Sequence, residues 1–232
     1  MLLPGPLRNV FRGSRGGQPA PNGGAASRFS SRTATSPQDG QSTRSSRGLE
    51  EFFGHIHGQS GLTLLDLGGA SQQNISFITD LGHRFCSEDF LQLLGDVSGA
   101  DGAAAQANPG RIEYFLRQAL DYPERHFDGV LVWDVLEYLA PALLTAVMDR
   151  LHKIVRPGSC MLAFFHADDK LDLVPYYSFR IQDVKTLNVT QHGARRPAQL
   201  FNNRSLEKLF ARSESVKFFL TKDRLREVVV KA

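Results

Sequence analysis

The stretch LLDLGGASQQN, residues 64–74, decides the fold, because an apolar run passes directly into a glycine-rich turn. The run extends over 62–68 and is too apolar for a strand with one solvent-exposed face. It therefore predicts a central parallel strand that is buried on both faces. Ser71 is placed to cap a helix over 71–82, and Gly82 to end it. A strand, a glycine turn and a helix in this order predict a ligand-binding turn at the carboxyl end of the strand.

The chain beyond Gly48 continues to alternate strand-like and helix-like segments. The predicted strands are 83–89, 127–133 and 159–166, and the predicted helices are 49–56, 111–120, 141–155 and 202–212. Two strand-like runs joined by TKDR, residues 221–224, predict a closing antiparallel hairpin. Residues 95–110 are small and flexible and show no convincing strand. The alternation predicts an α/β fold with a mostly parallel, Rossmann-like sheet and helices on both faces.

The turn lacks the residues that phosphate-bearing ligands require. A dinucleotide turn reads G-x-G-x-x-G, and counting from Gly68 the second and third glycines are missing. The phosphate loop G-x-x-x-x-G-K-[ST] is absent as well, because no lysine follows the turn. The turn therefore favours a ligand without phosphate.

Acidic residues end the first two predicted strands. Asp66 ends one, and Glu88 and Asp89 end the next, 22 residues further on for Glu88. A ribose-binding acid follows such a turn at an interval of about 20 residues, and one carboxylate can accept from both ribose hydroxyls. S-adenosylmethionine carries a ribose and an amino group but no phosphate, so it is a ligand of the kind that this turn and these acids suit. Glu88 and Asp89 remain alternatives for the ribose.

Two longer segments resemble class I S-adenosylmethionine-dependent methyltransferases. They are LLDLGGASQQNISFITDLGHRFCSEDF and FDGVLVWDVLEYLAPALLTAVMDRLHKIVRPGSCMLAFFH. In that family the first strand ends D-x-G-x-G-x-G, the second ends in an acid, and the fourth reads like FDxVxxxDVLEHL before a helix and a PGG turn. The resemblance covers residues 60–232 in order, and WDVLEYL with RPG is its most specific part. It implies a seven-stranded methyltransferase sheet and methyl transfer from S-adenosylmethionine.

The resemblance also implies roles for individual residues. The implied cofactor-binding residues, in chain order, are Asp66, Gly68, Gly69, Ser71, Glu88, Asp89, Asp121, Trp133 and Asp134. Asp66, Gly68 and Ser71 would line the methionine end, and Glu88 would take the ribose. Asp66 has the structural alternative of capping the helix that follows it.

The resemblance also implies contacts to the adenine and near the methyl group, and the sequence departs from the family pattern at three points. Asp121, in ALDYP, is the candidate for a contact to the adenine, while Trp133 and Asp134 would face the methyl group. Trp133 could instead be a core residue, and Asp134 could instead cap the turn that follows it. Gly69 and Ala70 replace alternating glycines, PGS replaces PGG, and no third strand is visible. These departures leave a second function open, a catalytically inactive Rossmann-like protein that binds a partner.

No catalytic dyad is evident, and the candidates are Asp134, His166 and Tyr177. His166 ends a strand where a general base could sit, although a surface histidine is the default expectation. Tyr177 lies in 170–200, an insertion predicted to cover the substrate side. Methyl transfer needs little side-chain chemistry, because the sulfonium methyl is already activated. The acceptor, a small molecule, a lipid or a protein side chain, stays open.

Residues 1–48 form a tail rich in Arg, Gly and Ser, with seven arginines and one acid, Asp39. This composition predicts disorder, and an organelle transit peptide is the alternative to a cytoplasmic protein. The tail carries +6 and the remaining domain, 49–232, carries −3 of the net +3. The charge therefore argues against nucleic-acid binding by the folded part, although the tail alone suits contacts to RNA phosphates.

The remaining residue types indicate a reduced, intracellular protein. Cys86 and Cys160 sit singly in apolar runs and predict neither a disulfide nor a metal site. His55, His57 and His83 lack the spacing of metal ligands, so no metal is expected. No apolar stretch approaches the ~20 residues that a membrane span needs.

Overall fold

The structure is a computed structural model and describes residues 40–99, 102–168 and 171–232, all in one unit of the chain. The predicted disorder of residues 1–39 lies outside the described residues. The elements are β1 (Gln41–Ser45), α1 (Arg47–Ile56), β2 (Thr63–Asp66), α2 (Gln72–Asp80), β3 (Arg84–Ser87), α3 (Phe90–Ser98), α4 (Gly102–Ala105), α5 (Pro109–Ala119), β4 (Phe127–Trp133), the 3-10 helix η2 (Val135–Tyr138), α6 (Pro141–Ile154), β5 (Val155–His166), β6 (Val174–Asp183), β7 (Thr186–Arg195), α7 (Asn203–Leu209), β8 (Ser215–Leu220) and β9 (Leu225–Lys231).

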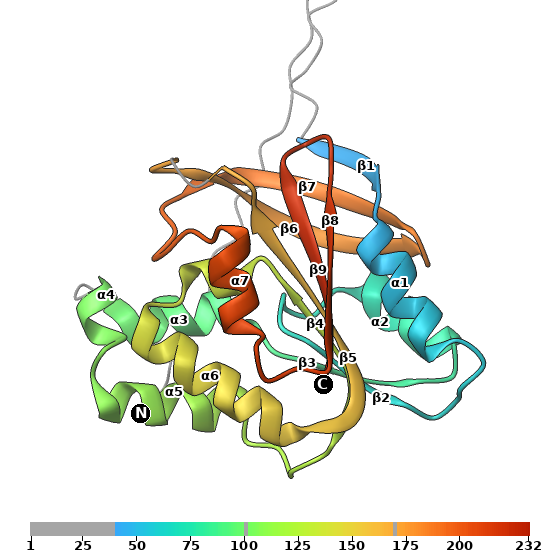
Figure 1. The fold of residues 1–232 in the computed structure, drawn as a ribbon, viewed down its shortest axis with the longest axis horizontal. Coiled ribbons are helices and arrows are strands. Elements are labelled where there is room, and N and C mark those ends of the chain that lie inside the picture. Colours follow the sequence, from blue (N-terminus) through green and yellow to red (C-terminus); the bar gives the residue numbers. More distant parts are fainter. Residues whose placement is uncertain (1–39, 100–101, 169–170) are drawn as a thin grey trace, which may run out of the picture. The chain divides into compact units, whose positions relative to one another are not determined.

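The main sheet has the strand order β3-β2-β4-β5-β9-β8. Strands β3, β2, β4 and β5 run parallel, whereas β9 is antiparallel to both β5 and β8 (Figure 1). The predicted parallel sheet and its closing hairpin are therefore confirmed. Parallel strands bring the carboxyl ends of β2, β3, β4 and β5 to one edge of the sheet, where ligands bind in folds of this kind.

The prediction of seven strands is wrong, because the main sheet has six. Between β3 and β4 the described residues form the helices α3, α4 and α5 and no strand. The segment 95–110 is rich in Gly and Ala and has no run of β-branched residues, so nothing in it favours a strand. Asn108 instead caps α5, and Pro109 stands in its first turn.

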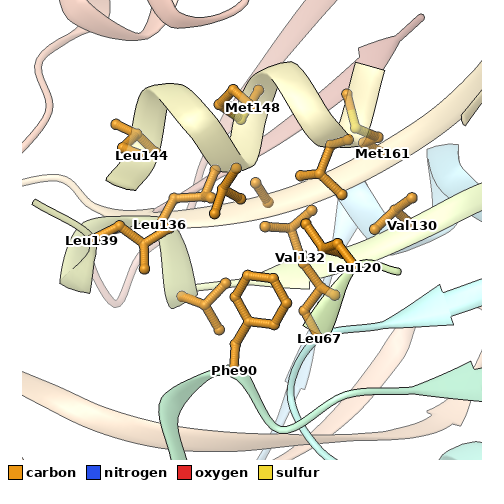
Figure 2. Close-up of a cluster of buried hydrophobic side chains, with 14 of the residues drawn as sticks. Leu67, Phe90, Leu120, Val130, Val132, Leu136, Leu139, Leu144, Met148 and Met161 are labelled. Atoms are coloured by element: carbon orange, nitrogen blue, oxygen red, sulfur yellow. The ribbon is translucent and has the colours of Figure 1, made fainter. Parts of the chain in front are cut away.

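Residues of β4 alternate between the two faces of the sheet. Val130 and Val132 belong to a buried cluster with α3, α5, α6 and α7, part of which Figure 2 shows. Leu131 and Trp133 belong to a second cluster, with α1, α2 and the hairpin β6-β7. Helices thus pack on both faces, as the apolar runs predicted. No helix in the described residues is long and apolar enough to cross a bilayer.

A second sheet, here called the lid sheet, consists of the strands β1, β7 and β6 in that order, all antiparallel. The predicted insertion 170–200 supplies the hairpin β6-β7, and β1 comes from the predicted tail. Gln41 to Ser45 pair with Thr190 to Thr186, and the buried Ser46 caps α1. The expected domain boundary after residue 48 is therefore wrong, because Gln41–Ser45 are part of the fold.

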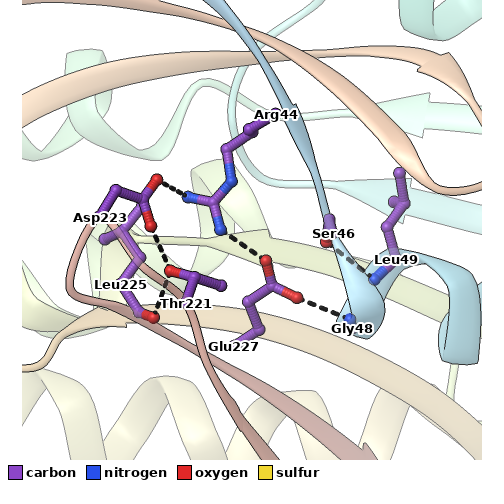
Figure 3. Close-up of polar contacts among 8 residues, drawn as sticks. All are labelled: Arg44, Ser46, Gly48, Leu49, Thr221, Asp223, Leu225 and Glu227. Carbon is purple, nitrogen blue, oxygen red and sulfur yellow. Dashed lines mark hydrogen bonds and ion pairs between the residues drawn. The ribbon is translucent and has the colours of Figure 1, made fainter.

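A buried ion pair joins β1 to the closing hairpin (Figure 3). The Arg44 guanidinium lies 2.6 Å from the carboxylate of Glu227 and 2.9 Å from that of Asp223. The second oxygen of Glu227 accepts from the backbone N–H of Gly48 at 2.6 Å, and Glu227 is fully buried. Arg44 is thus the cation that compensates a buried carboxylate, and it fixes the first strand of the lid sheet.

We expect Arg44→Met to lower the free energy of unfolding by about 3–5 kcal/mol, because it leaves the Glu227 charge buried without its cation. Urea unfolding measures this loss. Lys217→Met is the matched control, since Lys217 pairs with Glu51 at 2.6 Å with 57% and 40% of the side chains exposed. Such exposed pairs contribute at most about 1 kcal/mol. Equal losses in the two variants would contradict the assignment.

Candidate functional site

Asp66, the last residue of β2, is fully buried and hydrogen-bonded on both carboxylate oxygens. Oδ1 accepts from the backbone N–H of Gly68 at 2.8 Å and from Nε1 of Trp133 at 2.7 Å. Oδ2 accepts from Nδ2 of Asn74 at 3.0 Å. Burial raises the pKa of Asp66 to about 6, although these three hydrogen bonds oppose the rise.

The indole of Trp133 lies directly over the glycine turn. A Cβ on Gly68 would come within 2.6 Å of Cδ1 of Trp133, so only glycine admits the indole here. The ring stacks on Phe179 of β6, with centroids 5.2 Å apart and planes 9° apart. Trp133 has φ +56°, a strained conformation for a bulky residue, and is 2% exposed.

Little space is left at this edge of the sheet. The cavity between the turn, the end of β4 and β6 measures about 60 Å³. Its lining includes Asp66, Gly68, Asn74, Asp89, Trp133, Asp134, Tyr176, Tyr177 and Phe179. Pockets that hold small molecules measure about 300–1,000 Å³. The cavity has room for water but not for a nucleoside.

S-adenosylmethionine therefore does not fit the site in this conformation. Asp66 and Gly68, which were expected to line its methionine end, are at this edge, but the Trp133 indole occupies the space over Gly68 and donates a hydrogen bond to Oδ1 of Asp66. The Asn74 amide takes up the other oxygen. A cofactor would have to displace the indole before it could reach Asp66.

The other predicted cofactor residues are distributed around the cavity and away from it. Asp89 lines the cavity, caps α3 through Gln92 N–H at 2.9 Å and lies against Gly69. Glu88 is turned toward the hydroxyl of Tyr122, which donates a hydrogen bond to it.

Ser71 and Asp121 do not belong to the lining. The Ser71 hydroxyl caps α2 by accepting from the backbone N–H of Asn74, and Asp121 is exposed. Of the two acids proposed for a ribose, the structure thus places Asp89 nearer the cavity.

A second buried polar group stands at the ends of β4 and β5. Both oxygens of Glu137 bind His166, one accepting the backbone N–H at 2.9 Å and one lying 2.6 Å from Nδ1. Nε2 of His166 and Oδ2 of Asp134 have no hydrogen-bond partner among the described residues. Burial raises the pKa of Asp134 to about 7, with Glu137 adding to the rise and His166 and Arg195 opposing it.

The candidate catalytic residues thus lie together on the inner side of the lid sheet. Asp134 and Tyr177 line the cavity, and the His166 ring stacks on Tyr177, with centroids 6.2 Å apart. His166 is 5% exposed, so the expectation of a surface histidine is wrong.

The sequence matches no protein-family model and no curated protein. Several solved structures resemble it. The 1,6-didemethyltoxoflavin-N1-methyltransferase of Burkholderia thailandensis is 13% identical, with a TM-score of 0.44 over 79% of this chain and 76% of that chain. A SAM-dependent methyltransferase from Archaeoglobus fulgidus is 12% identical, with a TM-score of 0.47 over 79% of this chain and 91% of that chain.

The strand order decides the fold, with β2 and β4 at its centre and the antiparallel pair β8-β9 at its edge. The chain has a Rossmann-like α/β fold with a closing antiparallel hairpin, as the sequence predicted. It has one strand fewer than the sheet that the resemblance implied, and its lid sheet covers the edge at which such a fold binds ligands.

Sequence reasoning missed three residues that shape the site. Asn74 falls within the predicted helix 71–82, and its side chain joins Asp66 to β6. Phe179 and Glu137 carried no signal of their own, because an aromatic residue in an insertion and an acid in a helical turn are both common. The motif WDVLEYL does contain Glu137, and its burial could have been suspected from the apolar residues around it.

We expect Asp134→Asn to flatten the pH dependence of stability. A carboxyl with a folded-state pKa of about 7 stabilises the fold below pH 4 relative to neutral pH, and this stability is lost as pH rises through 7. The full effect reaches about 4 kcal/mol for a pKa raised from 3.8 to about 7. The variant should therefore gain stability over the native protein at pH 8 but not at pH 4. Urea unfolding at both pH values measures the gain, and an equal gain at both would contradict the assignment.

Proposed function

We propose that this protein transfers a methyl group from S-adenosylmethionine to an acceptor, in a conformation more open than the one described. The observation that carries the proposal is the pair of buried polar atoms without partners, Oδ2 of Asp134 and Nε2 of His166, at the ligand-binding edge of the sheet. A buried polar atom without a partner lowers stability, and a catalytic role or a bound ligand, water or ion is among its explanations.

The fold and the sequence resemblance support the same proposal. Asp66, Gly68, Trp133 and Asp134 lie together at the carboxyl ends of β2 and β4, where the motif resemblance puts them. Asp89 is the acid that we assign to the ribose, because it lines the cavity and is exposed. The acceptor would enter on the side of Tyr177, which covers His166.

A second candidate function, a non-catalytic protein that binds a partner, is favoured by a different observation. Each oxygen of Asp66 already has a partner within the chain, and the cavity of about 60 Å³ is too small for a nucleoside. A fold whose ligand site is permanently filled by its own side chains would have this geometry.

Calorimetric titration with S-adenosylhomocysteine tests the proposal. We expect saturable binding, and about tenfold weaker binding by Asp89→Asn, because an amide replaces the charged acceptor for the ribose. Asparagine keeps the cap of α3, so the fold is retained. Asp121→Asn is the matched control and should bind as the native protein does, since Asp121 lies outside the cavity lining.

The proposal is contradicted if neither the native protein nor a variant with a loosened lid sheet, Phe179→Leu, binds the ligand at millimolar concentration. The second candidate function would then be the better one. Circular dichroism of each variant confirms that it is folded before the titration.

A further inference from the structure

The space that a cofactor needs is occupied by a side chain of the protein itself. The Trp133 indole lies against Gly68, where a Cβ would come within 2.6 Å of it, and it is 2% exposed. We infer that Trp133 is a displaceable plug, and that S-adenosylmethionine enters only when the indole leaves Asp66 and β6 moves off the sheet edge. This inference rests on the proposed function and adds how access of the ligand to the site is controlled.

The indole makes a contact that a ligand could replace. Its Nε1–H donates to Oδ1 of Asp66 at 2.7 Å. An ammonium group is an N–H donor too, and it carries a charge, which makes its hydrogen bond to a carboxylate stronger than that of a neutral indole. The amino group of the methionine end can therefore compete for the same oxygen.

The plug is held from the outside by β6. Phe179 stacks on the indole with centroids 5.2 Å apart, and Phe164 of β5 meets it edge-on at 5.6 Å. Asn74 ties β6 to the turn, because its side chain donates to the backbone oxygen of Phe179 and accepts from the N–H of Ile181 at 2.8 Å. The same amide also donates to Asp66.

The position of β6 in the lid sheet permits this strand to move. β6 is an edge strand that pairs only with β7, while β1 is fixed on the far side of β7 by the buried Arg44. Lifting β6 breaks the ring stack and the hydrogen bonds that Asn74 and Gln73 make to its backbone, and it exposes the buried side chains of Phe179 and Ile181, but it leaves the strand pairs of the main sheet intact. The closed arrangement is therefore the more stable one without a ligand, and binding has to supply the free energy of opening.

The backbone of Trp133 favours release. A φ of +56° is rare for a residue with a bulky side chain and persists only where the surrounding packing enforces it. When Phe179 no longer presses on the ring, the residue can return to an ordinary conformation, and its side chain leaves Gly68. Strain of this kind at a ligand site is typical of a two-state element.

Intrinsic fluorescence tests the inference, because Trp133 is the only tryptophan in the chain. Emission from the native protein is followed while S-adenosylhomocysteine is added, with calorimetry under the same conditions. We expect the emission maximum to shift to longer wavelength as the indole leaves its buried site, with the same midpoint as the heat signal.

A variant pair separates opening of the lid sheet from general loosening of the protein. Phe179→Leu weakens the stack on Trp133, so it should raise the affinity for S-adenosylhomocysteine about tenfold by increasing the population of the open state. Phe115→Leu changes another buried phenylalanine, in the other cluster, and should leave the affinity unchanged.

The outcomes distinguish the inference from the proposed function. Binding that leaves the tryptophan emission unchanged, or equal affinities of Phe179→Leu and the native protein, would overturn the plug and leave the proposed function standing. Binding by Phe179→Leu alone supports both. If no protein binds the ligand at millimolar concentration, the proposed function fails and the plug is a permanent part of the core.

Discussion

The buried carboxylate of Asp66 is the group on which the arrangement of the ligand edge depends. A carboxylate without solvent is tolerated only where donors compensate its charge, and here they come from three parts of the chain, the turn at Gly68, the helix residue Asn74 and the strand end Trp133. Asn74 extends the same network to β6. One side chain thus sets the positions of β2, α2, β4 and the lid sheet relative to one another.

The local parts of this arrangement could be predicted from the sequence, and the non-local parts could not. Apolar runs and caps such as Ser71 are local signals, so β2, α2, β4, α6 and the closing hairpin were found. The pairing of Gln41–Ser45 with β7 joins residues more than a hundred positions apart. Composition alone assigned those five residues to a disordered tail, because a polar, Arg- and Ser-containing strand resembles a linker until its partner is known.

The position of the candidate site could be predicted from the sequence, but its conformation could not. The motif resemblance named Asp66, Gly68, Trp133 and Asp134, and the parallel strands bring these residues to one cavity. Nothing in the motif says where the Trp133 side chain points, because the rings that it packs against, Phe179 and Phe164, come from later segments of the chain. The choice between Glu88 and Asp89 likewise depended on Tyr122, which turns Glu88 away.

The buried polar groups at this edge of the sheet differ in whether all of their atoms have hydrogen-bond partners. Both oxygens of Asp66 accept hydrogen bonds from the chain itself, whereas Asp134 and His166 each have one buried atom without a partner among the described residues. Both oxygens of Glu137 are committed to His166, which holds the ring in one orientation with Nε2 directed away from Glu137. A site that was only a relic of an enzyme would gain stability by replacing such atoms with apolar ones, because an unpaired buried polar atom lowers stability by about 1–3 kcal/mol. The unpaired atoms of Asp134 and His166 thus lower the stability of the fold, and a ligand that paired with them would restore it.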